Sequence, residues 1–271
     1  MNDSAAKRVR TRHFDSAKKA GHVITGLTSY DFLTAKIFDD AGVDFLLVGD
    51  SAASSVFGYD STLPVTIDDL IPLARGVVNG ASRALVVADL PFGSYENSPD
   101  QALTSATRFM KESGVHAVKL EGGVRVAAQI SRITGAGIPV MGHIGFTPQS
   151  EHGLGGNVVR GRGDSARDLM ADALAVQQSG AFAVVVELVP SAVASEIAAV
   201  LTIPVIGIGA GNGVDGQILV WTDLAGMSDR RLPTFVKQYA NLRGVLSDAV
   251  ETWQGEVRSR AFPDAAHSFT D

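Results

Sequence analysis

The sequence contains no cysteine, and this absence excludes disulfide bonds and thiolate metal sites. Charged residues make up only 19% of the 271 positions, and the formal net charge of −6 argues against the basic surface that binds nucleic acid. The chain also lacks an unbroken apolar run long enough to span a membrane. Any bound metal must therefore be held by oxygen or imidazole ligands, for which a hard cation is the simplest choice.

Apolar residues are abundant, at 45%, and they are arranged in runs of strand length that alternate with helix-like segments. Most of the runs are apolar on both faces, which is typical of parallel strands covered by helices. Eight strand candidates in a chain of this length favour an α/β fold of the (β/α)8 TIM barrel type over a doubly wound sheet. The expected strands are 22–27, 44–49, 84–89, 116–121, 138–143, 182–187, 204–208 and 216–220.

The two ends of the chain differ from this alternating pattern. Residues 1–21 are basic but lack the apolar core of a signal peptide, so we expect a cytoplasmic protein with a solvated N-terminal arm or short helix. Residues from about 232 to 271 read as one or two helices, namely the eighth barrel helix and an extension. Because no linker or low-complexity stretch interrupts the chain, we predict one domain over residues 1–271.

Four of the apolar runs end in an acidic residue: Asp50, Asp89, Glu121 and Glu187. In parallel barrels the loops after the strands build the active site, so these carboxylates should face one common mouth. One such acid alone could equally cap the next helix, but caps usually lie a few residues beyond the strand. Lys119, two residues before Glu121, points to the same face of its strand. The set indicates a functional cluster, although a buried ion pair that only fills the barrel is the alternative.

Three other features carry less weight. The stretch GIGAGNG at 207–213 resembles a dinucleotide-binding loop, but Asn212 stands where the third glycine should be, so close packing or a tight loop is favoured. His143 has no second histidine at metal-ligand spacing, and we interpret it as a supporting or packing residue. The glycine-rich stretch 145–165 is expected to form a mobile lid or a surface excursion.

Carboxylates that converge in a thiol-free pocket suit Mg²⁺, which often keeps bound waters and takes only one or two protein carboxylates. A substrate with adjacent carboxylate and keto oxygens could chelate such an ion. The ion would then stabilise the enolate that forms when the neighbouring proton is lost. The residues therefore predict Mg²⁺-dependent enolate chemistry on a 2-oxo acid.

Motifs along nearly the whole chain resemble those of the ketopantoate hydroxymethyltransferase family. The matching motifs are LTSYD, LLVGDS, GYDSTLPVT, ADLPF, VKLEGG, GHIGFTPQS, GRGD, IPVIGIGAG and DGQILV. The resemblance implies a (β/α)8 barrel of the phosphoenolpyruvate/pyruvate-like superfamily, assembled as a homodecamer of two pentamers. It also implies Mg²⁺-dependent transfer of a hydroxymethyl group from 5,10-methylenetetrahydrofolate to 3-methyl-2-oxobutanoate, which gives ketopantoate in pantothenate biosynthesis.

The resemblance further implies roles for particular residues. Asp50 and Asp89 match metal ligands that also lie at the substrate, and Glu121 matches a residue that supports the metal. Ser51 and Lys119 match residues that hold the 2-oxo acid. These assignments give a role to each of the strand-end acids on the second, third and fourth runs.

Glu187 matches the residue assigned as general base in the family, and Asp89 acting through a water molecule is the alternative base. The chain departs from the family pattern in the lid stretch, where Asn157 and Val158 replace an aromatic and a basic residue. This departure bears on lid closure and folate affinity and leaves the strand-end chemistry untouched.

Three rival functions fit parts of the pattern. A class I aldolase would use Lys119 to form a Schiff base with the keto group, which chelators and borohydride would distinguish from metal chemistry. The isocitrate lyase and phosphoenolpyruvate mutase barrels keep the metal, but their catalytic loops typically carry a cysteine, which is absent here. A catalytically silent binding module would use the acids only to hold an ion, and the complete acid set argues against it.

Overall fold

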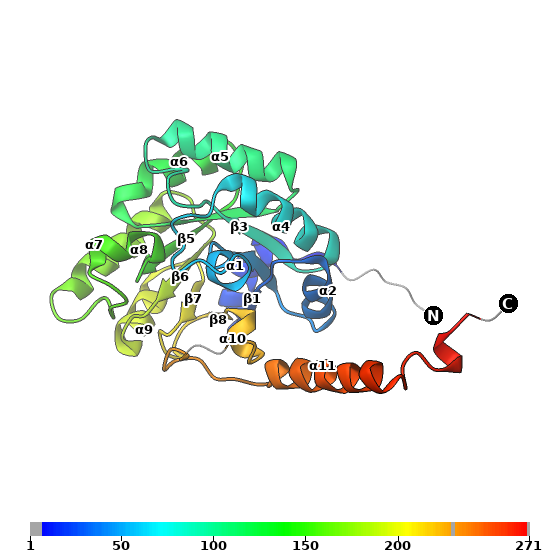
Figure 1. Cartoon of the computed structure of the whole chain (residues 1–271). Helices are drawn as coiled ribbons and strands as arrows, with labels where there is room; N and C mark the ends of the chain where they lie inside the picture. Colours follow the sequence, from blue (N-terminus) through cyan, green and yellow to red (C-terminus); the bar gives the residue numbers. More distant parts are fainter. Residues whose placement is uncertain (1–6, 229–230, 270–271) are drawn as a thin grey trace. The chain divides into compact units, whose positions relative to one another are not determined.

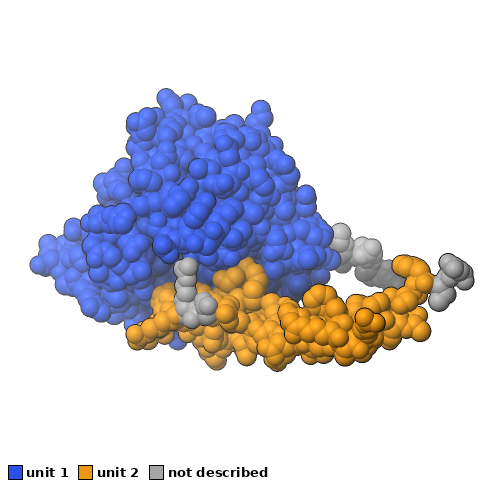
Figure 2. Space-filling view, in the orientation of Figure 1, with its two compact units in different colours: residues 1–220 blue, residues 221–271 orange. Residues whose placement is uncertain are grey.

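The computed structural model describes residues 7–228 and 231–269. Contacts between Cα atoms divide the chain into two compact units, Met1–Val220 and Trp221–Asp271 (Figure 2). Within the described ranges, no helix is long and apolar enough to cross a membrane. The division into units reports local compactness only, so one domain over residues 1–271 stays a prediction.

Unit 1 is a closed barrel of eight parallel strands, each paired with the next along the chain, and the last strand pairs with the first (Figure 1). This confirms the predicted (β/α)8 fold, and every strand boundary lies within two residues of its predicted position. The strands are β1 (Ile24–Thr28), β2 (Phe45–Val48), β3 (Leu85–Asp89), β4 (Ala117–Glu121), β5 (Val140–Gly145), β6 (Ala183–Glu187), β7 (Val205–Ile208) and β8 (Gly216–Leu219).

Helices connect the strands and cover the outside of the barrel (Figure 1). Local sequence sets their ends: in α5, Ser98 accepts a hydrogen bond from the Gln101 N–H, Pro99 is the first helical residue, and Gly114 follows at φ +77°, as its sequence predicts. The unit 1 helices are α1 (Thr11–Ala20), α2 (Phe32–Asp40), α3 (Ala52–Ser55), α4 (Ile67–Gly80), α5 (Pro99–Glu112), α6 (Ala127–Gly135), α7 (Glu151–Leu154), α8 (Ser165–Gln178) and α9 (Ser191–Val200).

Helix α1 closes the N-terminal end of the barrel. Phe14 is fully buried, and its ring centroid lies 5.7 Å from that of Phe45 and 5.1 Å from that of Phe182. Lys18 on the same helix forms a 2.7 Å ion pair with Asp215. Of the two expected alternatives, the short helix is present, and its apolar side is buried and not solvated; residues 1–6 lie outside the described residues. Phe14 and Ala17 pack into the core, whereas Arg12 and Lys19 are exposed.

The N-terminal end of β3 is held by one buried carboxylate. Asp39 lies near the end of α2. Its carboxylate accepts hydrogen bonds from the hydroxyl of Ser82 and from the backbone N–H groups of the three residues that precede β3, which are Ser82, Arg83 and Ala84. Burial opposes ionisation of Asp39, but these donors outweigh it and lower the pKa of the carboxyl below 3.8. The charged side chain thus ties a helix to a strand.

Unit 2 contains α10 (Trp221–Leu224) and α11 (Leu242–Ser259), followed by a short 3₁₀ turn at Ala265–His267. The expectation of one or two helices from Leu232 onward is met by α11. Residues 231–241 form no helix, so the predicted eighth barrel helix is absent from that stretch. Asn241 caps α11 by accepting a hydrogen bond from the Gly244 N–H.

Candidate active site

The four predicted acids come together at the C-terminal ends of the barrel strands. Asp50 lies just after β2, and Asp89, Glu121 and Glu187 are the last residues of β3, β4 and β6. Asp50, Asp89 and Glu121 are only 5%, 2% and 1% exposed. The side chain of Glu187 is the most open, at 16%. The strands therefore deliver three carboxylates into a buried cluster and a fourth to its edge.

Lys119 joins the cluster from β4, where it lies opposite Asp89 in the strand register. Its Nζ is 2.7 Å from Asp89 Oδ1 and 3.1 Å from Nδ1 of His143. Burial opposes the charge on Lys119, but the surrounding carboxylates outweigh it and raise the pKa of the ammonium group. Lys119 is therefore held as a cation whose first partner is Asp89.

Asp50 shows how strongly the acids repel one another. Its burial raises the pKa to about 8, and the neighbouring charges of Asp89 and Glu121 act in the same direction. The pKa of Asp89 is also raised, mainly by burial, even though Lys119 stabilises its charge. One lysine thus leaves the three buried carboxylates short of positive charge.

His143, on β5, bridges the cluster and Glu187. Its Nδ1 lies 3.5 Å from Glu121 Oε1, and its Nε2 lies 3.2 Å from Glu187 Oε2. Burial and the charge of Lys119 lower the pKa of the ring, whereas Glu121 and Glu187 raise it. A proton on Nδ1 would nevertheless point at the Lys119 ammonium group. We therefore assign the neutral ring, with its proton on Nε2 facing Glu187.

Ser51, the remaining predicted site residue, lies beside Asp50 at the start of α3. Its Oγ is 2.8 Å from the phenol oxygen of Tyr30, which follows β1. Burial raises the pKa of Tyr30 to about 12, so the phenol stays protonated. The hydroxyl of Ser51 is thereby held at the edge of the acid cluster.

Gln149 is the central residue that sequence reasoning missed. Its Nε2 donates to Asp50 Oδ2 at 2.9 Å and to the Leu90 carbonyl, its backbone N–H donates to Glu121 Oε2 at 3.0 Å, and its Oε1 accepts from Tyr95 Oη at 2.7 Å. The side chain and the backbone N–H of this one residue therefore connect acids from the ends of two strands. Its place in the motif GHIGFTPQS was the available signal.

The donor set fits a divalent cation. Oε1 of Glu121 is buried without a hydrogen-bond partner and lies 3.5 Å from His143 Nδ1, whereas Oδ1 of Asp89 is paired with Lys119. The like charges around Asp50 call for further positive charge. Within residues 7–228 and 231–269, no group of three or more His, Asp and Glu side chains is preassembled as a metal cage. Mg²⁺ commonly takes only one or two carboxylates together with waters and substrate oxygens, so a full cage is not required.

The two glycine-rich stretches have different structures. The stretch 145–165 contains a 3₁₀ turn at Pro148–Ser150 and α7, and Asn157 and Val158 lie exposed in the segment that leads to α8. In the loop after β7, a Cβ on Gly211 would overlap Ser191, and one on Gly213 would overlap Ser195. The glycines of GIGAGNG thus permit close packing against α9, which confirms that interpretation.

Sequence comparison identifies relatives over nearly the entire chain. A family model described as ketopantoate hydroxymethyltransferase matches residues 8–265. The 3-methyl-2-oxobutanoate hydroxymethyltransferase of Leifsonia xyli subsp. xyli is 64% identical over 263 residues, covering 97% of this chain and 95% of the relative. The enzyme of the same name from Saccharopolyspora erythraea is 60% identical, covering 97% of this chain and 90% of the relative.

Solved structures with the same fold are more distant in sequence. A phosphonopyruvate hydrolase complex with oxalate and Mg²⁺ superposes with a TM-score of 0.62 at 12% identity, covering 95% of this chain and 92% of that one. A 2,3-dimethylmalate lyase of the phosphoenolpyruvate mutase/isocitrate lyase superfamily gives a TM-score of 0.59 at 17% identity, covering 96% and 91%. These likenesses show the barrel fold alone.

Proposed function

The chain belongs to the ketopantoate hydroxymethyltransferase family, and we propose from this premise how its strand-end residues carry out the reaction. The enzyme transfers a hydroxymethyl group to 3-methyl-2-oxobutanoate and forms ketopantoate for pantothenate biosynthesis. The activity implies methylenetetrahydrofolate as the one-carbon donor. The C3–H bond of the 2-oxo acid breaks, a new C3–CH₂ bond forms, water supplies the hydroxyl oxygen, and tetrahydrofolate leaves.

Glu187 takes the proton from C3. It is the most open of the four acids, and the neutral His143 presents Nε2 to Oε2 of Glu187 at 3.2 Å, which fixes the direction of the carboxylate. The contact leaves the other carboxylate oxygen for the substrate. A positioned base of this kind typically accelerates proton transfer by about a hundred- to ten-thousand-fold. Asp89 acting through a water molecule is the alternative base.

Asp50 and Asp89 hold Mg²⁺, and Glu121 supports them through its position beside Asp89. When bound there, Mg²⁺ supplies Lewis-acid stabilisation of the enolate oxygen. The raised pKa of Asp50 among the charges of Asp89 and Glu121, and the buried Glu121 Oε1 without a hydrogen-bond partner, support this assignment. Asp50 and Asp89 are placed to orient the keto end of the substrate at the same time.

Lys119 and Ser51 bind the 2-oxo acid. The ammonium group of Lys119 attracts the substrate carboxylate, and the hydroxyl of Ser51, oriented by Tyr30, donates to a substrate oxygen. The contact between Lys119 and Asp89 also bears on the class I aldolase alternative. A lysine engaged at 2.7 Å by a carboxylate is an ammonium ion and lacks the free electron pair that Schiff-base formation requires.

The observation that carries this mechanism is the pairing of Glu187 with His143 apart from the three buried acids. The test is Glu187→Gln, which keeps the shape and removes the basicity. We expect C3 hydrogen exchange with deuterated water, measured by NMR without folate, to slow by about a hundredfold or more. Binding of Mg²⁺ and 3-methyl-2-oxobutanoate should persist. If exchange continues at the parental rate while transfer fails, Glu187 serves the folate half of the reaction.

We propose a cytoplasmic homodecamer of two pentamers, in keeping with the family. Helix α11 supports assembly, because it exposes apolar side chains at helical spacing, namely Val250, Trp253 and Val257. Analytical ultracentrifugation tests the proposal, and a stable monomer at micromolar concentration would contradict it.

The exposed Asn157 and Val158 lie in the lid stretch, where we propose that they reduce closure over the folate.

A further inference from the structure

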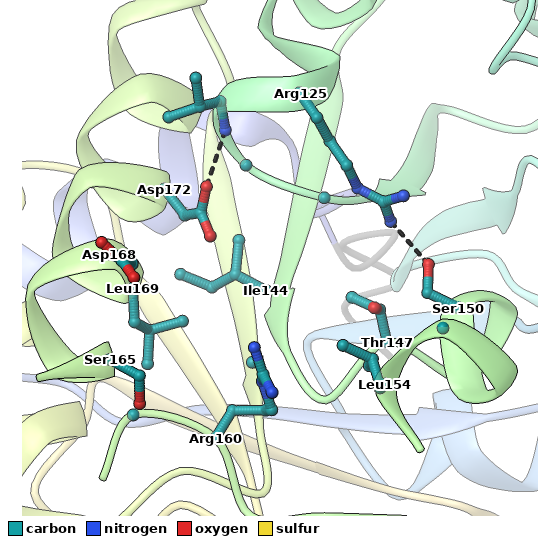
Figure 3. A pocket seen from close by; sticks show the side chains of 16 residues that line it. Arg125, Ile144, Thr147, Ser150, Leu154, Arg160, Ser165, Asp168, Leu169 and Asp172 are labelled. Carbon is teal, nitrogen blue, oxygen red and sulfur yellow. Dashed lines mark hydrogen bonds between the residues drawn. The ribbon is translucent and has the colours of Figure 1, made fainter. Parts of the chain in front are cut away.

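A cavity of about 580 Å³ lies next to the acid cluster, between the loops after β4 and β5 and the N-terminal half of α8 (Figure 3). Its size is in the usual range for small-molecule sites. Ile144, Leu154 and Leu169 supply apolar side chains, and Arg160 projects into the space between them (Figure 3). The cavity therefore combines apolar side chains with two arginines, Arg125 and Arg160.

The polar groups of the cavity divide into two kinds. Asp172 accepts a hydrogen bond from the Val124 N–H at 2.8 Å, and Arg125 donates to Ser150 Oγ at 2.7 Å, so both serve the protein itself (Figure 3). The half-buried guanidinium group of Arg160 has neither a hydrogen bond nor an ion pair within the part of the chain that the structure describes. Arg160 is thus free to bind an anion that enters the cavity.

The cavity adjoins the reaction centre through three short connections. Gly122 lines the cavity and directly follows Glu121, and Ile144 directly follows His143. Thr147 lines it two residues before Gln149, which contacts Asp50 and Glu121. The cavity therefore opens at the same end of the barrel as the acid cluster, beside the last residues of β4 and β5.

We infer that the cavity receives the p-aminobenzoyl-glutamate portion of the folate donor and that Arg160 binds a carboxylate of its glutamate. The inference rests on the proposed function, which requires methylenetetrahydrofolate. The apolar wall of Ile144, Leu154 and Leu169 suits the benzoyl ring, and the fork of the guanidinium group suits a carboxylate. Arg160 is therefore a residue of donor binding and takes no part in proton abstraction.

Asp168 distinguishes the two possible orientations of the donor. Its exposed carboxylate lines the cavity and would repel a glutamate carboxylate, whereas it would accept hydrogen bonds from the N–H groups of a pterin ring. A pterin ring in the cavity would thus gain from Asp168, whereas a glutamate tail would not. If the tail lies beside Arg160, as we infer, the pterin ring lies toward the acid cluster and does not contact Asp168. Loss of the Asp168 charge should then leave donor affinity unchanged or strengthen it.

The test compares the folate donor with 5,10-methylenetetrahydropteroate, which lacks the glutamate. We expect Arg160→Ala to raise the KM for methylenetetrahydrofolate by about tenfold or more, because a hydrogen-bonded ion pair is lost. The KM for the pteroate donor should be nearly the same in the variant and the parent. The KM for 3-methyl-2-oxobutanoate should change much less than the KM for the folate donor. Arg160→Lys should recover part of the affinity.

Arg162→Ala is the matched control, because Arg162 lies in the same segment, is exposed and does not line the cavity. Equal KM increases in the Arg160 and Arg162 variants would overturn the inference and indicate a general charge effect. Equal increases for both donors would overturn it as well, and so would an Asp168→Asn variant that weakens folate binding more than Arg160→Ala does. Each of these results leaves transfer by the parent enzyme intact and so is distinguishable from failure of the proposed function.

Discussion

The two ends of the barrel treat a buried carboxylate in opposite ways. Asp39 and Asp50 flank the same strand, β2, and each is 5% exposed. At the N-terminal end, backbone N–H groups surround Asp39 and lower its pKa below 3.8. At the C-terminal end, burial and the charges of Asp89 and Glu121 raise the pKa of Asp50 to about 8. Equal burial therefore leads to opposite preferences for the charged form.

The difference separates a carboxylate that stabilises the fold from one that we propose serves the chemistry. Asp39 compensates donors that would otherwise be unsatisfied, so its charge contributes to folding. Asp50 is placed among like charges, so its charge costs stability unless a cation is bound. Repulsion between buried carboxylates is typical of active sites, where residues needed for activity lower the stability of the fold.

The largest expected effect comes from Asp50→Asn, which replaces the carboxylate at the C-terminal end of the comparison with a neutral amide. We expect hydroxymethyl transfer at saturating Mg²⁺ to fall by about a thousandfold, since several kcal/mol of charge stabilisation is lost. The melting temperature of the metal-free protein should rise by about 2–4 °C, because a like charge is removed while an acceptor for Gln149 remains. Steady-state rates and calorimetry measure the two effects. Near-parental turnover would contradict the ligand assignment.

Asp39→Ala removes the buried carboxylate at the N-terminal end of the barrel. It leaves the N–H groups of Arg83 and Ala84 without an acceptor, so we expect the free energy of unfolding to fall by about 3 kcal/mol. The kcat of the folded protein should not change, because Asp39 lies at the opposite end of the strands. Urea denaturation and active-site-normalised kinetics provide the measurements. Asp40→Ala is the control, because its exposed pair with Lys36 should contribute little.

Gln149→Ala tests how far one hydrogen bond stabilises the charge of Asp50, because it removes the side-chain amide that donates to this carboxylate. The backbone contact with Glu121 survives, whereas Asp50, Leu90 and Tyr95 lose a partner. We expect kcat/KM for 3-methyl-2-oxobutanoate to fall by about tenfold, equivalent to one positioning hydrogen bond. Isothermal titration with Mg²⁺ separates two explanations. A gain in Mg²⁺ affinity together with higher activity would show that the amide competes with the metal for Asp50.

The smallest effect is a pH dependence with opposite signs at the two ends, measured by denaturation of metal-free protein. The raised pKa of Asp50 stabilises the fold below 3.8, and this stabilisation is lost as the pH rises toward about 8. The parent should therefore lose stability relative to Asp50→Asn over that window. Relative to Asp39→Asn, the parent should keep a constant advantage there and lose it as the pH falls through the lowered pKa of Asp39. Parallel curves would disprove the pKa assignments.

The sequence predicts the strands well because parallel barrel strands are apolar on both faces, and an acid at the end of such a run is conspicuous. Asp50, Asp89, Glu121 and Lys119 were brought together as their strand positions require, and their individual roles stay predictions. The N-terminal helix was misjudged because its basic residues outweighed the helical spacing of Phe14 and Ala17.

Two important residues have roles that the hydrophobic pattern of the sequence does not reveal. Asp39 stands beside Asp40, and nothing in the pair Asp-Asp tells which is buried, because the N–H partners of Asp39 lie 43 to 45 positions away. Gln149 lies in an aperiodic stretch, and its side-chain partners Tyr95 and Asp50 are 54 and 99 positions away. Contacts over such separations depend on barrel closure, which pattern reading does not resolve.

The ion pair between Lys18 and Asp215 has a consequence for folding during translation. It joins residues 197 positions apart, and the Phe14 ring on the same helix must wait for Phe182 to emerge. The first helix made is therefore among the last to dock, and its apolar face stays exposed while the remaining strands are synthesised. During translation, this segment is where a chaperone would be expected to bind.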